Sequence, residues 1–121
     1  MPQFRRHYRG YQLPDQSYAD SADPSFSIAA GKELVCGPFE VKGQQDKTLW
    51  VSFNGIIDVE LYIAPELDSL QTDFLLYKDN IATVANIPFI YHSNHTYPGL
   101  IIKFINNTLA PITGKGWLFA Q

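Results

Sequence analysis

The residues of this 121-residue chain that could do chemistry are few, and most stand apart from one another. Asp58 and Glu60 lie two positions apart, so on a β-strand their carboxylates would share one side about 7 Å apart. Glycosidases use paired carboxylates at about such a spacing. Acidic residues also keep the outer face of an amphipathic strand in water, and we expect that role here because the flanking residues alternate between apolar and polar.

Two of the three histidines, His92 and His95, stand three positions apart in an H-x-x-H pattern. A zinc site needs three or four ligands, and no Cys, Asp or Glu lies near them in the sequence, so an exposed polar loop is expected. The only cysteine, Cys36, follows an apolar pair and is expected to be a small buried hydrophobe. The chain has no nucleophile elbow and no phosphate-binding glycine loop. We therefore predict a non-enzymatic protein with no cofactor and no metal.

All arginines of the chain, Arg5, Arg6 and Arg9, are found in residues 1–12, which contain no acid. Three aspartates give residues 13–26 a charge of −3, and residues 27–121 carry six lysines against nine acids. Three prolines and one glycine interrupt residues 1–26, so this segment is predicted to be an extended N-terminal arm with a basic tip.

Aromatic side chains are scattered among the arginines of the arm, which is unusual for a purely solvated tail. Three positive charges are few, and the acids elsewhere would oppose binding to nucleic acid. We therefore expect the arm to dock on an acidic protein surface, such as a neighbouring copy; an untethered tail is the alternative. The residues predicted to bind a partner are those of the arm together with two aromatics of residues 47–64: Phe4, Arg5, Arg6, Tyr8, Arg9, Tyr11, Trp50 and Tyr62.

Residues 47–64 carry the clearest secondary-structure pattern. Residues 47–53 alternate, with Leu49, Val51 and Phe53 on one face, and residues 56–64 alternate in the same way. Between them stand Asn54 and Gly55, a pair that favours a type I′ turn. The pattern predicts a β-hairpin over residues 47–64.

Further short strands are expected around residues 27–29, 33–35, 38–42, 72–77, 81–85, 87–92, 100–105 and 116–120. Residues 66–71 are predicted to be a helical turn or a loop, and residues 78–80 a turn. Residues 100–105 are apolar except for Lys103, which is typical of a central strand covered on both faces.

About eight short strands separated by turn residues predict an all-β, antiparallel β-sandwich or jelly roll, with a small closed barrel as the alternative. The sandwich would occupy residues 27–121 and the arm residues 1–26. Gly116 and Trp117 near the end suggest that the last strand completes a sheet. No apolar run is long enough to cross a membrane, and the first residues lack the apolar segment of a signal peptide, so neither a membrane nor secretion is expected.

The short-strand sandwich and its closing run, YPGLIIKFINN over residues 97–107 followed by GWLFA over residues 116–120, resemble the small jelly-roll virion proteins of tailed bacteriophages, the cement or decoration type. The resemblance is one of general sequence character and not of a defined motif. It covers residues 27–121 and carries over no functional residue. It implies a structural protein of the virion, made in the host cytoplasm. It further implies binding to the major capsid protein or another virion protein, as a homo-oligomer whose arm spans neighbouring subunits.

Three functions follow from these observations. The first is the capsid cement or decoration protein, with a neck or tail structural protein as a variant. The second is a carbohydrate-binding or receptor-binding β-sandwich that stacks exposed Tyr and Trp on sugar rings. The third, an enzyme, would require a cleft that joins Asp58, Glu60 and a histidine.

Overall fold

The computed structural model describes residues 9–14, 25–67, 72–83 and 87–121, and in these ranges the chain is all-β. Its strands are β1 (Arg9–Gln12), β2 (Phe26–Ile28), β3 (Glu33–Glu40), β4 (Lys47–Phe53), β5 (Ile56–Ala64), β6 (Leu75–Ala82), β7 (Phe89–Ser93), β8 (Gly99–Ile105) and β9 (Ile112–Ala120).

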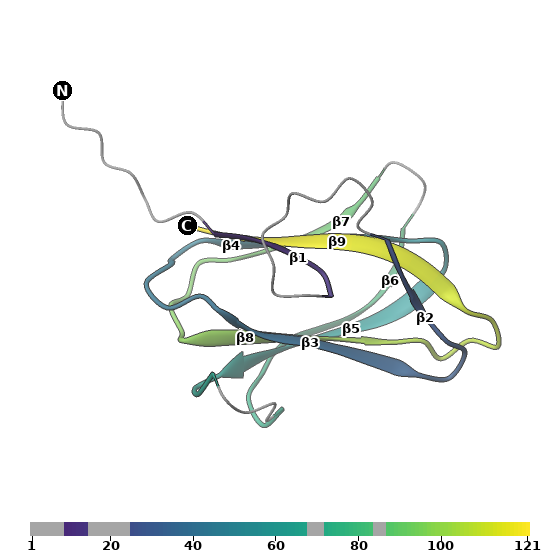
Figure 1. Cartoon of the computed structure of the whole chain (residues 1–121), viewed down its shortest axis with the longest axis horizontal. Helices are drawn as coiled ribbons and strands as arrows, with labels where there is room; N and C mark the ends of the chain where they lie inside the picture. Colours follow the sequence, from purple (N-terminus) through teal and green to yellow (C-terminus); the bar gives the residue numbers. More distant parts are fainter. Residues whose placement is uncertain (1–8, 15–24, 68–71, 84–86) are drawn as a thin grey trace.

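The strands form two antiparallel sheets that lie as two layers (Figure 1). The five-stranded sheet has the order β1-β9-β4-β7, and β2 pairs with β9. The four-stranded sheet has the order β3-β8-β5-β6. The predicted antiparallel β-sandwich is therefore confirmed, with nine strands in the described ranges where about eight were expected.

The core lies between the two inner faces and follows the alternation of each strand. Leu49, Val51 and Phe53 of β4 are buried, as are the inward residues of β5 from Ile57 to Leu61, so the predicted faces are confirmed there. The pairing register with β6 shifts after Leu61, and beyond this irregularity Ala64 is the buried residue. Cys36 is also buried, as its apolar surroundings indicated.

The predicted hairpin over residues 47–64 is wrong, because β4 and β5 belong to different sheets (Figure 1). Each strand already has two neighbours: β4 pairs with β7 and β9, and β5 pairs with β6 and β8. Gly55 lacks the positive φ that a type I′ turn requires. Asn54 instead donates its backbone N–H to the Thr113 carbonyl, and its side-chain oxygen accepts the Thr113 N–H. The Asn-Gly pair therefore carries the chain from one sheet to the other.

Several strand boundaries also differ from expectation, and β3 (Glu33–Glu40) is one strand where two, over residues 33–35 and 38–42, were expected. Residues 78–80 continue β6 instead of turning, and this strand at the end of its sheet order keeps Lys78, Asp79 and Asn80 exposed to water. β9 begins at Ile112, four residues before the expected start. Residues 9–12, expected in the arm, form β1 and pair with β9, and Leu13 after them is fully buried. Residues 1–8, 15–24, 68–71 and 84–86 lie outside the described residues, so the arm is described only at residues 9–14 and 25–26.

Asn106 connects two loops at one end of the sandwich, the one after β2 and the one after β8. Its side chain is fully buried and donates to the carbonyls of Ile28, Ala29 and Ala110 at 3.0, 3.2 and 2.8 Å. Its side-chain oxygen accepts the N–H and the hydroxyl of Thr108. The Asn-Asn-Thr sequence here matches the glycosylation pattern, but its asparagine serves the fold and is closed to solvent.

Replacing Asn106 with Ala should lower the free energy of unfolding by about 3 kcal/mol, because several buried backbone groups lose their partners. Urea denaturation followed by circular dichroism would measure the loss. Asn94→Ala is the matched control, since Asn94 is exposed and heads the other glycosylation pattern; we expect its change to stay within about 0.5 kcal/mol. Equal stabilities of the two variants would contradict the role of Asn106.

Candidate functional site on the five-stranded sheet

The outer face of the five-stranded sheet carries a cluster of aromatic side chains. The register places Trp50 of β4 opposite Trp117 of β9 on one side and opposite Ile90 of β7 on the other. One step along β9, Phe119 lies opposite Thr48. We call Trp50, Trp117 and Phe119 the aromatic platform.

Strand alternation forces these rings outward. Trp50 stands between Leu49 and Val51, each only 1% exposed, so its own side chain must leave the core face. Trp117 and Phe119 flank the fully buried Leu118 in the same way.

The platform is open to solvent and its rings support one another. The Trp50 side chain is 41% exposed and packs edge-on against Phe119, with ring centroids 6.5 Å apart. A shallow hollow of about 570 Å³ is lined by Thr48, Trp50, Trp117, Phe119 and Gln121. Exposed apolar patches with polar rims often mark binding sites, because water solvates them poorly. The platform is therefore a candidate binding site.

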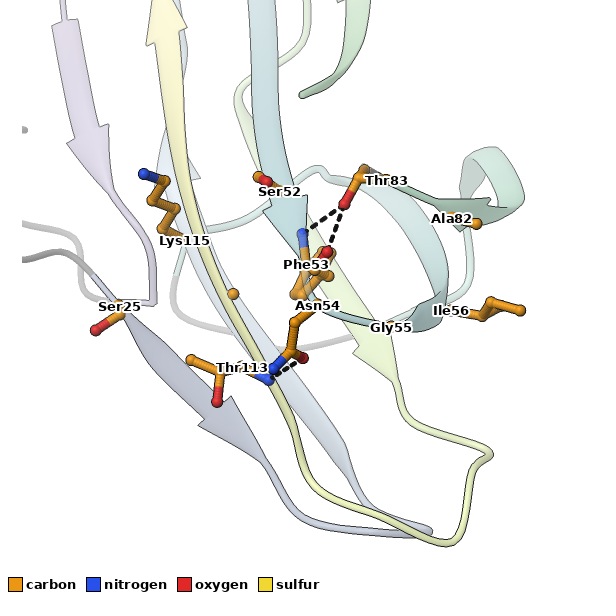
Figure 2. A pocket seen from close by; sticks show the side chains of 11 residues that line it. Ser25, Ser52, Phe53, Asn54, Gly55, Ile56, Ala82, Thr83, Thr113 and Lys115 are labelled. Carbon is orange, nitrogen blue, oxygen red and sulfur yellow. Dashed lines mark hydrogen bonds between the residues drawn. The ribbon is translucent and has the colours of Figure 1, made fainter. Parts of the chain in front are cut away.

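A second hollow, of about 540 Å³, lies where β4 crosses to β5 (Figure 2). We call it the corner hollow; its polar lining includes Ser25, Ser52, Asn54, Thr83, Thr113 and Lys115. Thr83 closes the end of β4 by hydrogen bonds to both the N–H and the carbonyl of Phe53, each 2.7 Å long (Figure 2). These bonds and the Asn54–Thr113 pair fix the walls of the hollow.

The outer face of the four-stranded sheet has the opposite character, because charges of both signs alternate across it. Lys103 of β8 lies opposite Glu60 of β5 and forms an ion pair with Glu33 of β3 at 3.3 Å. Lys78 of β6 lies 4.0 Å from Glu60 on its other side. Each pair has one well-exposed partner, Lys78 or Glu33, which keeps this face hydrated, and ion pairs open to water contribute little to stability.

Asp58 and Glu60, the two carboxylates with glycosidase-like spacing, accept hydrogen bonds from neighbouring side chains on this charged face. Asp58 accepts hydrogen bonds from the side-chain amides of Asn80 and Asn107. Glu60 accepts the Tyr62 hydroxyl proton at 2.5 Å. The nearest described histidine in the sequence, His92, lies on β7 of the other sheet. Asp58, Glu60 and His92 therefore do not form the cleft that the enzyme hypothesis requires.

Tyr62 belongs to the charged face and not to the platform. The hydrogen bond to Glu60, followed by partial burial and the nearby charges of Glu60 and Glu33, raises the Tyr62 pKa to about 12. Trp50 and Tyr62, both predicted to bind a partner, therefore lie on opposite faces of the molecule.

The arm residues predicted to bind a partner are only partly within the described residues. Phe4, Arg5, Arg6 and Tyr8 lie outside them, and Arg9 is described as the first residue of β1. Tyr11 is buried: its ring packs on Phe39 with centroids 5.2 Å apart, and its hydroxyl donates to the Glu40 carbonyl. Tyr11 therefore holds β1 to the opposite sheet.

The two histidines of the H-x-x-H pattern have separate surroundings. His92 lies 3.5 Å from the Asp46 carboxylate, whereas the backbone carbonyl of His95 accepts a hydrogen bond from Lys47. No group of three or more metal-ligating side chains exists in the described ranges.

Lys47 is a buried cation that the sequence interpretation missed. Its ammonium donates to the carbonyls of Gln44, Gln45 and His95 and lies 4.3 Å from the centre of the Tyr97 ring. Burial lowers the Lys47 pKa, and the charge of Asp46 partly opposes the shift. The sequence did hold a signal, because Lys47 stands in phase with Leu49 and Val51 on the inward face.

No family model matches the sequence, and a search of curated proteins finds no match. Among the described residues, no helix has the length and apolar character needed to cross a bilayer.

Replacing Glu60 with Gln should bring the Tyr62 pKa from about 12 back toward its ordinary value near 10, because the hydrogen bond to a charged carboxylate is its main cause. Since the folded-state pKa is the raised one, the stabilisation from this pair is complete below pH 10 and is lost between pH 10 and 12. Tyrosinate absorbance during alkaline titration, compared with Tyr62→Phe, measures the shift. A wild-type Tyr62 that ionises near pH 10 would contradict the assignment.

Lys47→Met should destabilise the protein by about 2–3 kcal/mol, because buried carbonyls lose a charged donor. Lys42→Met is the matched control, since Lys42 is exposed in the preceding loop and should be nearly neutral. Burial lowers the Lys47 pKa below 10.5, its value in the unfolded chain. Between the lowered pKa and pH 10.5 the free energy of unfolding of the wild-type protein should therefore rise with pH, and the variant should lack this rise. Urea denaturation at several pH values tests both; a neutral Lys47→Met would contradict them.

Proposed function

We propose that the protein is a non-enzymatic recognition protein that binds saccharide through the aromatic platform. The observation that carries the proposal is the row of Trp50 and Trp117 held side by side on the exposed face of a rigid sheet. Sites on strands hold side chains more precisely than sites on loops, so the rings are positioned before a ligand arrives.

A sugar ring suits this surface chemically. Its C–H groups form an apolar face that packs on indole and phenyl rings, and aromatic rings give large contact area. Its hydroxyls need partners at the rim, and Thr48 and Gln121 line the hollow while Gln12 pairs with Trp117 in the register. This mixture of rings and neutral polar groups supports the receptor-binding form of the sandwich.

The resemblance to bacteriophage virion proteins supplies the proposed setting. In that setting the protein is a decoration protein of the particle, attached through residues 1–26 to the major capsid protein or another virion protein, as a homo-oligomer. The pairing of Arg9 with Ala120 supports this arrangement, because β1 stands at one end of the strand order and directly follows residues 1–8 of the arm in the sequence. Attachment and recognition would then use different parts of the chain.

A second candidate function uses the platform itself for attachment, as in a capsid cement protein. The specific observation in its favour is that Gly10 of β1, a strand within the arm, pairs with Phe119 of the platform. The described part of the arm and the platform are therefore neighbours in the same sheet. A single interface on a protein partner could use both.

Replacing Trp50 with Ala should weaken saccharide binding at least tenfold, because the most exposed ring of the platform is lost. Titration of oligosaccharides against tryptophan fluorescence would measure it, with Leu109→Ala as the control: Leu109 is fully exposed and belongs to the loop before β9. If no saccharide binds, but assembled capsid shells do so in a Trp50-dependent way, the cement function replaces the proposal. If neither ligand binds, both functions are wrong.

A further inference from the structure

The aromatic platform and the corner hollow lie along the same two strands. On the outer face, β4 presents Trp50 and then Ser52, while β9 presents Trp117 and then Lys115. Each pair stands directly opposite in the register, and successive outward residues of a strand are about 7 Å apart. The row formed by Ser52 and Lys115 is therefore the next step along the sheet from the tryptophan row.

The corner hollow offers donors for an anion. Ser52 and Thr113 contribute hydroxyls and Lys115 contributes an ammonium, all exposed or half-buried. Thr83 is engaged by Phe53 and Asn54 by Thr113, so those two side chains form the wall. Within the described part of the chain, no side-chain hydrogen bond or ion pair uses the ammonium of Lys115.

Charge supports an anionic ligand at this end of the face. Among the described residues that line the corner hollow there is no carboxylate, and Lys115 is the one that carries a charge. The described acid on the outer face of this sheet, Asp46, precedes β4 at the opposite end and lies beside His92. Charge-assisted hydrogen bonds from an ammonium to a carboxylate or sulfate are about twice as strong as neutral ones.

We propose that the saccharide bound by this face is an acidic one, carrying a carboxylate or sulfate that Lys115, Ser52 and Thr113 receive. One sugar ring stacks on Trp50 and Trp117, and the acidic group, on that ring or on the next one, extends about 7 Å along the sheet. The inference rests on the proposed saccharide-binding function and adds the class of ligand and its direction on the sheet.

The test compares a neutral oligosaccharide with its uronate counterpart of the same length and linkage, each titrated against the full chain by calorimetry. The uronate should bind at least fivefold more tightly at low ionic strength, and its advantage should shrink as salt is added because exposed charges are screened. Lys115→Gln should remove the advantage and leave neutral binding unchanged, whereas Lys115→Arg should keep it. Lys32→Gln, an exposed lysine in the turn before β3, is the control.

The outcomes separate this inference from the function on which it rests. If both saccharides bind equally, with Trp50→Ala weakening both and Lys115→Gln changing neither, the acidic ligand is wrong and saccharide binding stands. If the wild-type protein binds neither saccharide, the proposed function itself fails. If Lys115→Gln and Lys32→Gln lower uronate binding equally, the preference comes from net charge and the corner hollow is not the acid site.

Discussion

The fold depends on how closely the last strand approaches its neighbours. β9 pairs with β1, β2 and β4, and its inward positions include Gly114 and Gly116. A Cβ at Gly114 would lie 2.2 Å from the Phe53 ring, and one at Gly116 would lie 2.8 Å from the Trp50 carbonyl oxygen and 3.0 Å from Leu13. Only glycine leaves room at these positions for the large side chains that fill the core. The close packing of the five-stranded sheet therefore depends on the two glycines of β9.

The same strand determines what the protein presents to solvent. With Gly114, Gly116 and Leu118 inward, alternation places Lys115, Trp117 and the residues in phase with them outward. Close pairing with β4 then brings the outward residues of both strands into rows. The close approach needed for the core thus also creates the surface proposed for binding, while the charges of β3, β5, β6 and β8 keep the opposite face hydrated.

Period-two alternation in the sequence was enough to predict the sandwich and the two faces of β4 and β5. The hairpin failed because Asn54-Gly55 is a local signal, whereas the partners of a strand depend on free edges that distant segments occupy. The order of the strands in the sheet likewise explains why the site could be predicted only in part. Trp50 could be proposed from its own strand, but its pairing with Trp117, 67 residues later, is not local information. Lys47 was detectable, since its phase places it inward, and a buried lysine needs partners that only the folded loops supply.

The central claim is that the outer face of the five-stranded sheet is the recognition surface. Chemical-shift mapping of the isotope-labelled protein tests it directly, because each backbone amide and both indole N–H groups report separately on a titrated oligosaccharide. If this face binds the oligosaccharide, the indole signals of Trp50 and Trp117 and the amide signals of β4 and β9 should shift saturably. The amide signals of β5 and β6 should not change. Shifts centred on the charged face around Glu60 and Lys103, with the indoles unmoved, would contradict it.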